Sequence, residues 1–204
     1  MLRNPTLEMN IEPFRLRIDV TDDEFNAIYP RKIQRLAEKH FTPVSVAKTA
    51  SEFLVTKPGT KVLDIGSGAG KFCLVGTVNT SGHFTGIEQR PSLVELSKRL
   101  STSYGLNNVT FINANVTSID FNEYDAFYIY NSFYENLNNH DSIDDTVLLT
   151  PPLYNSYLMY TLGQLSRLSP AVRLVTYYTY HTIVPPSFKL IDSLHDGNLK
   201  LWER

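Results

Sequence analysis

The residues with the clearest chemical potential in this 204-residue chain form one short stretch. The apolar run 62–65 contains the acidic residue Asp64 and is followed by a turn with glycine at every second position from 66 to 70. Glycine lets a chain turn sharply and lets the backbone approach a ligand without a Cβ in the way. The apolar run 72–78 then predicts a buried helix, whose first N–H groups have no partner within the helix. Strand, glycine turn and helix in this order are typical of a nucleotide-type cofactor site in an open α/β sheet.

The spacing of the glycines narrows the class of ligand. The dinucleotide fingerprint G-x-G-x-x-G would place glycine at position 71, where this chain has Lys71. No G-x-x-x-x-G-K-[ST] pattern fits here, which excludes a phosphate loop of the Walker type. With Asp64 on the strand before it, the pattern Asp-x-Gly-x-Gly-x-Gly resembles motif I of the class I (Rossmann-like) S-adenosylmethionine-dependent methyltransferases.

The resemblance extends over about residues 41–204. It implies S-adenosylmethionine as cofactor and S-adenosylhomocysteine as its product. In motif I the implied cofactor contacts are Asp64, Gly66, Ser67, Gly68 and Gly70. Glu88, followed by Gln89, ends the second predicted strand, where α/β cofactor sites place an acid that accepts hydrogen bonds from ribose hydroxyls. We therefore assign Glu88 and Gln89 to the cofactor as well.

The third predicted strand and the segment before motif I complete the implied cofactor set. Asn115 stands where methyltransferases of this type have an acid that binds the adenine amino group, and its amide oxygen can still accept from that group. The backbone N–H of Val116 could bind adenine N1. Phe41 and Thr42, followed by Pro43, are similar to an aromatic-Thr-Pro segment that borders the cofactor in several amino-group methyltransferases. This segment also has a purely structural interpretation. A threonine N-cap, Thr42, followed by a proline as first helical residue, Pro43, is an ordinary way to start a helix.

The segment Asn131-Ser-Phe-Tyr134 follows the fourth predicted strand, whose end faces the methyl group of the cofactor in the family. It resembles the Asn/Asp-Pro-Pro-Tyr/Phe segment of enzymes that methylate planar amino groups, without its two prolines. It also resembles the Asn-Asn-Phe segment of the non-SET histone-lysine methyltransferases, where the asparagine contacts cofactor. Both resemblances imply a nitrogen acceptor, with Asn131 and Tyr134 as catalytic candidates and Asn131 also as a candidate cofactor contact. Asn and Ser are also common in turns, so a purely structural role for this segment is an alternative interpretation.

Aromatic residues on two predicted strands could wall a pocket for a flat or cationic acceptor group. They are Tyr128, Tyr130, Phe133, Tyr134, Tyr177, Tyr178 and Tyr180. Strand alternation requires about half of them to point into the core instead.

The pattern of the whole chain predicts the elements that position these residues. Five strand–helix units are followed by two alternating runs around Asp196-Gly197, a strong hairpin signal. We therefore expect an α/β fold with a doubly wound, seven-stranded, mostly parallel sheet and a C-terminal antiparallel hairpin. Residues 1–40 are expected to form an N-terminal helical extension packed on the core, with its helical pattern broken at Pro30. Residues 41–204 are expected to form the Rossmann-like methyltransferase domain.

Composition limits the remaining functional classes. The length suits one domain with a sizeable core, and the formal net charge of −2 gives no general attraction to nucleic acid or membrane. The single cysteine, Cys73, excludes an intramolecular disulfide and is expected to be a packed core thiol. We expect a cytoplasmic protein because there is no signal region and no apolar stretch of membrane-spanning length. The acidic residues around His140 are possible metal ligands. Solvated acidic loops are common, however, so we expect no metal site there.

The sequence thus predicts a methyltransferase that uses S-adenosylmethionine and acts on a nitrogen of an unknown protein or small-molecule acceptor. A nucleic-acid amino methyltransferase is an alternative that the missing prolines, the net charge and the lack of a recognition domain disfavour. A non-catalytic relative that only binds the cofactor is a third. His40 and His181 are candidate bases, although each is more often structural. The basic residues Arg31, Arg35 and Lys39 share one helical face, which is either solvated or a clamp for an acidic substrate.

Overall fold

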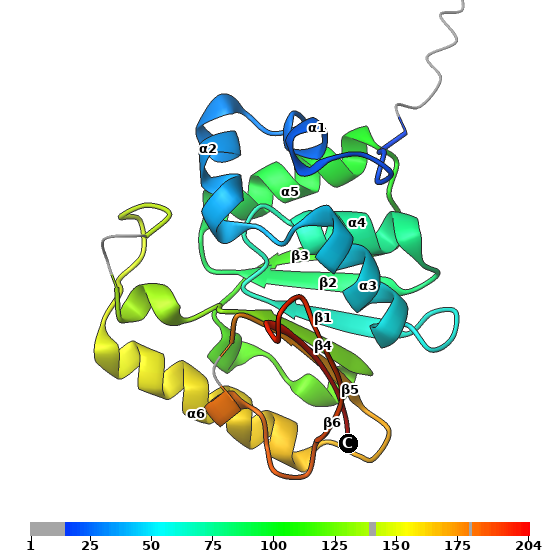
Figure 1. Ribbon diagram of the computed structural model, residues 1–204. Coiled ribbons are helices and arrows are strands. Elements are labelled where there is room, and N and C mark those ends of the chain that lie inside the picture. Colours follow the sequence, from blue (N-terminus) through cyan, green and yellow to red (C-terminus); the bar gives the residue numbers. More distant parts are fainter. Residues whose placement is uncertain (1–14, 139–141, 180) are drawn as a thin grey trace, which may run out of the picture.

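The computed structural model describes residues 15–138, 142–179 and 181–204. Within them, seven strands form one sheet in the order β3-β2-β1-β4-β5-β7-β6 (Figure 1). The strands are β1 (Lys61–Ile65), β2 (His83–Glu88), β3 (Val109–Asn113), β4 (Ala126–Tyr130), β5 (Arg173–Tyr177), β6 (Lys189–Leu194) and β7 (Leu199–Glu203).

The strand directions confirm the predicted fold. Strands β1 to β5 run parallel to one another, and β7 runs antiparallel to both β5 and β6. The hairpin turn contains His195, Asp196 and Gly197, all with positive φ. Positive φ at successive residues is typical of tight hairpin turns, and the Asp-Gly pair supplies residues that tolerate it. The fold is therefore a doubly wound, mostly parallel sheet with a C-terminal antiparallel hairpin.

Helices cover both faces of the sheet. The helices α3, α4 and α5 lie on one face and α6 lies on the other (Figure 1). The bounds are α1 (Asp22–Asn26), α2 (Arg31–His40), α3 (Val44–Leu54), α4 (Lys71–Asn79), α5 (Pro91–Ser103) and α6 (Pro151–Arg167), with 3-10 turns η1 (Val116–Ser118), η2 (Phe121–Glu123), η3 (Tyr134–Asn136) and η5 (His181–Ile183). None of the helices in the described ranges is long and apolar enough to cross a membrane.

The two-sided burial explains why the central strands are largely apolar. On β1, Val62 packs in the core beneath α3 and α4, while its neighbour Leu63 packs in the core beneath α6, and both are fully buried. Strands buried on both faces have continuous apolar runs because alternate side chains enter two different cores. Polar candidate residues such as Glu88 and Asn131 therefore lie at or just after the ends of these strands.

The N-terminal helices are joined to the core by a buried lysine. Thr21 and Glu24 form a capping box at the start of α1, and α2 starts after Pro30. The side chain of Lys71, 3% exposed, forms an ion pair with Asp22 and donates to Asn26 Oδ1 at 2.8 Å. Burial lowers the pKa of Lys71, and the hydrogen bond from Lys71 to Asp22 opposes that change. A division of the chain between residues 40 and 41 stays a prediction.

The start of α3 differs from the sequence-based expectation. The helix begins at Val44 after Pro43 in an extended conformation, and no side chain of the preceding residue caps it. Its first N–H instead donates to Asp22 Oδ1 at 3.0 Å. The hydroxyl of Thr42 is 2.9 Å from the hydroxyl of Tyr128 in the core. The prediction of Thr42 as N-cap is therefore wrong, because a carboxylate from a distant segment takes that role.

Candidate cofactor and acceptor site

A cavity of about 690 Å³ lies at the carboxyl ends of the parallel strands. Most of the site residues predicted from sequence line it, namely Phe41, Gly66, Gly68, Glu88, Gln89, Asn115, Val116, Asn131 and Tyr134. The lining does not include Thr42, Asp64, Ser67 or Gly70. The volume falls in the range of about 300–1,000 Å³ that is usual for small-molecule and cofactor sites.

Two glycines of the turn after β1 are required for different reasons. Gly66 has a φ of 78°, and a Cβ on it would stand 2.8 Å from the Cβ of Ser132, so a side chain would push the turn away from the segment after β4. Gly70 has a φ of 80° at the N-cap of α4, and a Cβ there would stand 2.7 Å from the ring of Phe111. Glycine alone tolerates both the positive φ and the close packing. The turn can therefore bring its backbone to the cavity wall.

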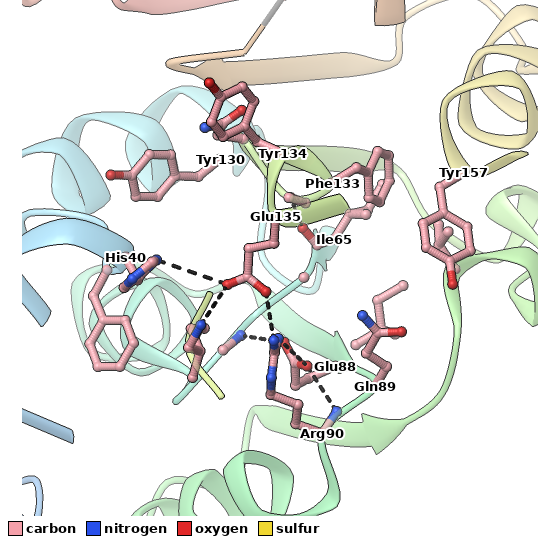
Figure 2. A pocket seen from close by; sticks show the side chains of 18 of the residues that line it. His40, Ile65, Glu88, Gln89, Arg90, Tyr130, Phe133, Tyr134, Glu135 and Tyr157 are labelled. Atoms are coloured by element: carbon pink, nitrogen blue, oxygen red, sulfur yellow. Dashed lines mark hydrogen bonds and ion pairs between the residues drawn. The ribbon is translucent and has the colours of Figure 1, made fainter. Parts of the chain in front are cut away.

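Glu88 ends β2 at the cavity wall (Figure 2). Its Oε2 accepts from the backbone N–H of Gly68 at 3.2 Å, and its Oε1 accepts from the backbone N–H of Arg90 at 2.8 Å. Burial raises the pKa of the Glu88 carboxyl, and the bonds from Arg90 and Gly68 oppose that rise. A carboxylate offers about four acceptor positions. One position on each oxygen is therefore left, which matches the two hydroxyls of a ribose.

Asp64, on β1, and Ser67, within the glycine turn, are not part of the cavity lining. Asp64 is 3% exposed, and the thiol of Cys73 is 3.4 Å from its Oδ2. Burial raises the pKa of Asp64 to about 7, with the thiol opposing and Glu88 adding to the rise. The Ser67 hydroxyl is buried without a hydrogen-bond partner among the described residues. Direct cofactor contact by either side chain stays a prediction.

Asn115 lines the cavity, but its side-chain amide is hydrogen-bonded to Thr117 and Tyr157. Its Oδ1 accepts from the N–H of Thr117 at 3.1 Å and from the Thr117 hydroxyl at 2.9 Å, which caps η1. Its Nδ2 donates to the hydroxyl of Tyr157 on α6 at 2.7 Å. Tyr157 also lines the cavity, with its ring centroid 5.5 Å from that of Phe133. Tyr157 was not expected from sequence, because 42 residues separate it from Asn115.

Asn131 is the first residue after β4 and has a φ of 45°. Its N–H donates to Thr179 Oγ1 at 2.9 Å, and its carbonyl accepts from the N–H of Tyr134 at 3.1 Å. The same Thr179 hydroxyl is 3.1 Å and 2.9 Å from the carbonyl oxygens of Ile129 and Tyr177. Non-glycine residues in left-handed conformations cluster at functional sites, although asparagine tolerates this conformation well. The backbone of Asn131 is thus fixed, and the residue lines the cavity.

Three tyrosines form an aromatic cluster at the cavity. The ring centroids of Tyr130 and Tyr177 are 4.8 Å apart, those of Tyr177 and Tyr178 are 4.7 Å apart, and all three residues line the cavity. Tyr178 is 53% exposed, so the cluster reaches solvent. Tyr128 instead points into the core, where it stacks on Phe72 with centroids 3.9 Å apart. The expected split of the tyrosines between pocket and core is therefore present.

Arg90 forms an ion-pair network that the sequence analysis missed (Figure 2). Its guanidinium is 4% exposed and lies 2.6 Å from Glu135 Oε2, 2.8 Å from Asp144 Oδ1 and 3.8 Å from Glu88 Oε1. His40 Nδ1 lies 4.0 Å from Glu135 Oε1. The only available sequence signal was an arginine two residues after Glu88 and acids near position 140. The network joins the end of β2 to the segments on both sides of residue 140.

The remaining candidates are placed as follows. His40 lines the cavity at the end of α2, and His181 begins η5. His140 and Tyr180 lie outside the described residues. In the described part of the chain, no group of three or more His, Cys, Asp or Glu side chains is arranged to hold a metal ion.

Comparison with known proteins finds a matching family model and a curated relative that is similar over part of the chain. A family model described as a methyltransferase domain matches residues 56–151. The 23S rRNA (uracil(1939)-C(5))-methyltransferase RlmD of Klebsiella pneumoniae is 37% identical over 71 residues, which are 35% of this chain and 16% of that protein. The chain therefore spans about a sixth of the length of this curated relative.

Solved structures share the fold at low sequence identity. TrmN from Thermus thermophilus matches with a TM-score of 0.58 and 17% identity, covering 85% of this chain and 52% of that one. An S-adenosylmethionine-dependent methyltransferase from Aquifex aeolicus matches with a TM-score of 0.50 and 19% identity, covering 78% and 87%. These likenesses and the strand order show that the chain has the fold of the class I (Rossmann-like) S-adenosylmethionine-dependent methyltransferases, and residues 56–151 match a methyltransferase domain.

Proposed function

We propose that the protein is an active methyltransferase that transfers the methyl group of S-adenosylmethionine to a nitrogen atom of a protein or small-molecule acceptor. One observation supports this most directly. The same cavity is lined by the glycine turn and Glu88 and also by Asn131 and the three tyrosines Tyr130, Tyr177 and Tyr178. Cofactor and acceptor could therefore meet in one cavity, as a group transfer requires.

The residues present fit the cofactor. The carboxylate of Glu88 has one acceptor position left on each oxygen for a ribose, and the glycine turn presents backbone without side chains. The N–H of Val116 is the first of η1 and has no acceptor within that turn. In this proposal the sites for the amino-acid part, the ribose and the base follow one another along the ends of β1, β2 and β3.

The acceptor chemistry follows from the residues on the other side of the cavity. Bound S-adenosylmethionine supplies a methyl group on a positively charged sulfur, which a nitrogen lone pair attacks in line. The amide oxygen of Asn131 can accept from an acceptor N–H and so direct the lone pair, and the Tyr134 hydroxyl can form a second hydrogen bond. The three tyrosines offer aromatic faces for a flat or cationic group. No strong base is required, because an amine can lose its proton to water after transfer.

A specific observation favours a nucleic-acid acceptor as a second candidate. Arg31, Lys32 and Arg35 are exposed on α2, and Lys39 at the end of this helix lines the cavity. Basic side chains that lead to an aromatic pocket suit a phosphate backbone with a stacked base. The named activity of the matched relative is also directed at RNA. The net charge of −2 remains an argument against this candidate.

Methylation of a pyrimidine carbon through a covalent thiolate adduct does not fit this chain. Such a step needs a nucleophile that adds to the ring. The single cysteine, Cys73, is fully buried on α4 and is not part of the cavity lining. A nitrogen acceptor needs no such adduct, because its lone pair is already nucleophilic.

Methyl transfer from labelled cofactor into cell extract tests the proposal. Purified protein is first titrated with S-adenosylhomocysteine and with NAD by calorimetry, and we expect binding in the micromolar range for the first and none for the second. It is then incubated with extract and S-adenosylmethionine labelled on the methyl group, beside the Glu88→Ala variant as inactive control. Products are separated by size and treated with nuclease or protease.

Each outcome of this experiment has a defined meaning. Label in small molecules or in protease-sensitive material supports the proposed acceptor, and label in nuclease-sensitive material supports the second candidate instead. NAD binding without S-adenosylhomocysteine binding would contradict the cofactor. Cofactor binding without transfer to any fraction would favour a relative that binds the cofactor and does not catalyse.

A further inference from the structure

The hydrogen bonds of the Asn115 amide fix its orientation. A backbone N–H can only donate, so the atom that faces the Thr117 N–H at 3.1 Å must be the amide oxygen. The Thr117 hydroxyl occupies the second acceptor position of that oxygen at 2.9 Å. Neither lone pair of Asn115 Oδ1 is then left for the amino group of an adenine, although the sequence suggested this role.

The same logic determines what the Tyr157 hydroxyl can still do. The amide nitrogen of Asn115 can only donate, so the Tyr157 oxygen accepts at 2.7 Å. A hydroxyl has two acceptor positions and one hydrogen, so one acceptor position and the hydrogen remain. Tyr157 is 7% exposed and lines the cavity, and its ring packs against Phe133. An oriented polar group with unused capacity thus faces the cavity beside Asn115.

The position of this hydroxyl points to the base of the cofactor. Asn113 at the end of β3 is the register partner of Glu88, so the residues after β3 lie next to the acid proposed for the ribose. We propose that Tyr157 binds the 6-amino group of the cofactor adenine by accepting a hydrogen bond from it, and that Asn115 orients the Tyr157 hydroxyl. This inference rests on the proposed use of an S-adenosyl cofactor. The N–H of Val116 then serves the adjacent ring nitrogen, and Tyr157 takes the role usual for an acid after the third strand.

Two ligands and two variants test the proposal by equilibrium binding, with no need for an acceptor. The ligands are S-adenosylhomocysteine and its analogue whose purine lacks the 6-amino group. The variants are Tyr157→Phe, which removes only the hydroxyl, and the matched control Tyr160→Phe on the same helix. The Tyr160 hydroxyl donates to the carbonyl of Ile119 at 2.9 Å and is not part of the cavity lining. Thermal melting confirms that each variant is folded.

We expect wild type and Tyr160→Phe to bind S-adenosylhomocysteine about three- to tenfold more tightly than the analogue, the usual range for one hydrogen bond. In Tyr157→Phe this ratio should fall to about one, because the partner of the amino group is gone. If the Tyr157→Phe ratio equals that of wild type, the inference is overturned, even when both affinities drop together. If wild type binds both ligands equally, the inference is also overturned while the proposed function stands. If wild type binds neither ligand, the proposed function fails and this inference with it.

Discussion

The backbone N–H of Gly68 donates a hydrogen bond to the carboxylate of Glu88 at 3.2 Å. This contact joins the glycine turn to the end of β2 and directs the remaining acceptor positions of Glu88 toward the cavity. We expect Glu88→Ala to weaken S-adenosylhomocysteine binding by about 2–3 kcal/mol, in the range for hydrogen bonds to a charged group. Glu88→Gln should lose less, because one acceptor oxygen remains. Calorimetry measures both affinities.

The matched control for Glu88 is Glu95→Ala, which removes an exposed acid on α5. Its affinity should equal that of wild type. A folded Glu88→Ala variant with unchanged affinity would show that the ribose is bound elsewhere.

Two substitutions of Asn131 can separate the role of its backbone conformation from the role of its side-chain amide. Asn131→Gly removes the amide but adopts the observed φ of 45° without strain, whereas Asn131→Ala adds strain of about 1 kcal/mol that should appear as lower stability in urea. If the amide positions the acceptor, both variants should lose turnover by about a hundredfold and keep most of their affinity for S-adenosylhomocysteine. If it holds cofactor, affinity and turnover should fall together. An Asn131→Gly variant that matches wild type in both would leave only a role in the turn.

Asp64 should make stability depend on pH. Its pKa is about 7 in the folded protein, mainly because of burial, against 3.8 for an ordinary carboxyl. The folded state binds this proton more tightly, so stability is lost as the pH rises from about 4 to about 7. Asp64→Asn cannot ionise and keeps an acceptor for the Cys73 thiol. Relative to wild type, its free energy of unfolding should therefore increase over this range, by a few kcal/mol, in urea titrations without ligand. Parallel pH profiles for the two proteins would contradict this.

Removal of the Arg90 guanidinium should loosen the segments around residue 140. Arg90→Met would leave Glu88, Glu135 and Asp144 close together without their cation, and breaking a buried network of this kind costs about 3 kcal/mol. We expect lower stability in urea and faster proteolysis after residue 131. Arg90→Lys should not restore the protein, because one ammonium cannot replace the planar fork that contacts two carboxylates. Arg99→Met, on the exposed face of α5, is the control, and equal proteolysis of both variants would refute the prediction.

Local patterns in the sequence were enough to predict the sheet. Glycine turns, apolar runs and the Asp196-Gly197 pair each act over a few residues, and β1, β2, β4 and the hairpin lie where these signals place them. The turn residues and Glu88 could be placed at the cavity for the same reason, because parallel strands end at one edge. Elements with a weak local signal were less well defined: the leucine spacing predicts a helix over residues 154–168, whereas α6 spans Pro151–Arg167.

Contacts between distant residues could not be predicted in this way. Tyr157 reaches Asn115 and Arg90 reaches Asp144 only because of how α6 and the preceding loop pack on the sheet. Nothing within either segment specifies the partner. The pairing of Thr42 with Tyr128, 86 residues apart, likewise overrode the local preference of threonine for a helix cap. A side chain with strong local preferences can therefore be misassigned when tertiary packing offers it another partner.

The carboxylate of Asp22 is shared between Lys71, the first residue of α4, and the N–H of Val44, the first residue of α3. A fragment that began at residue 41 would lose Asp22, Phe25 and Asn26, which contact the ammonium of Lys71, and would leave the start of α3 without its acceptor. We therefore expect that the predicted boundary between residues 40 and 41 does not separate two units that unfold independently. The two N-terminal helices and the sheet should melt in a single transition, and trimming those helices should yield an aggregation-prone fragment rather than a minimal enzyme.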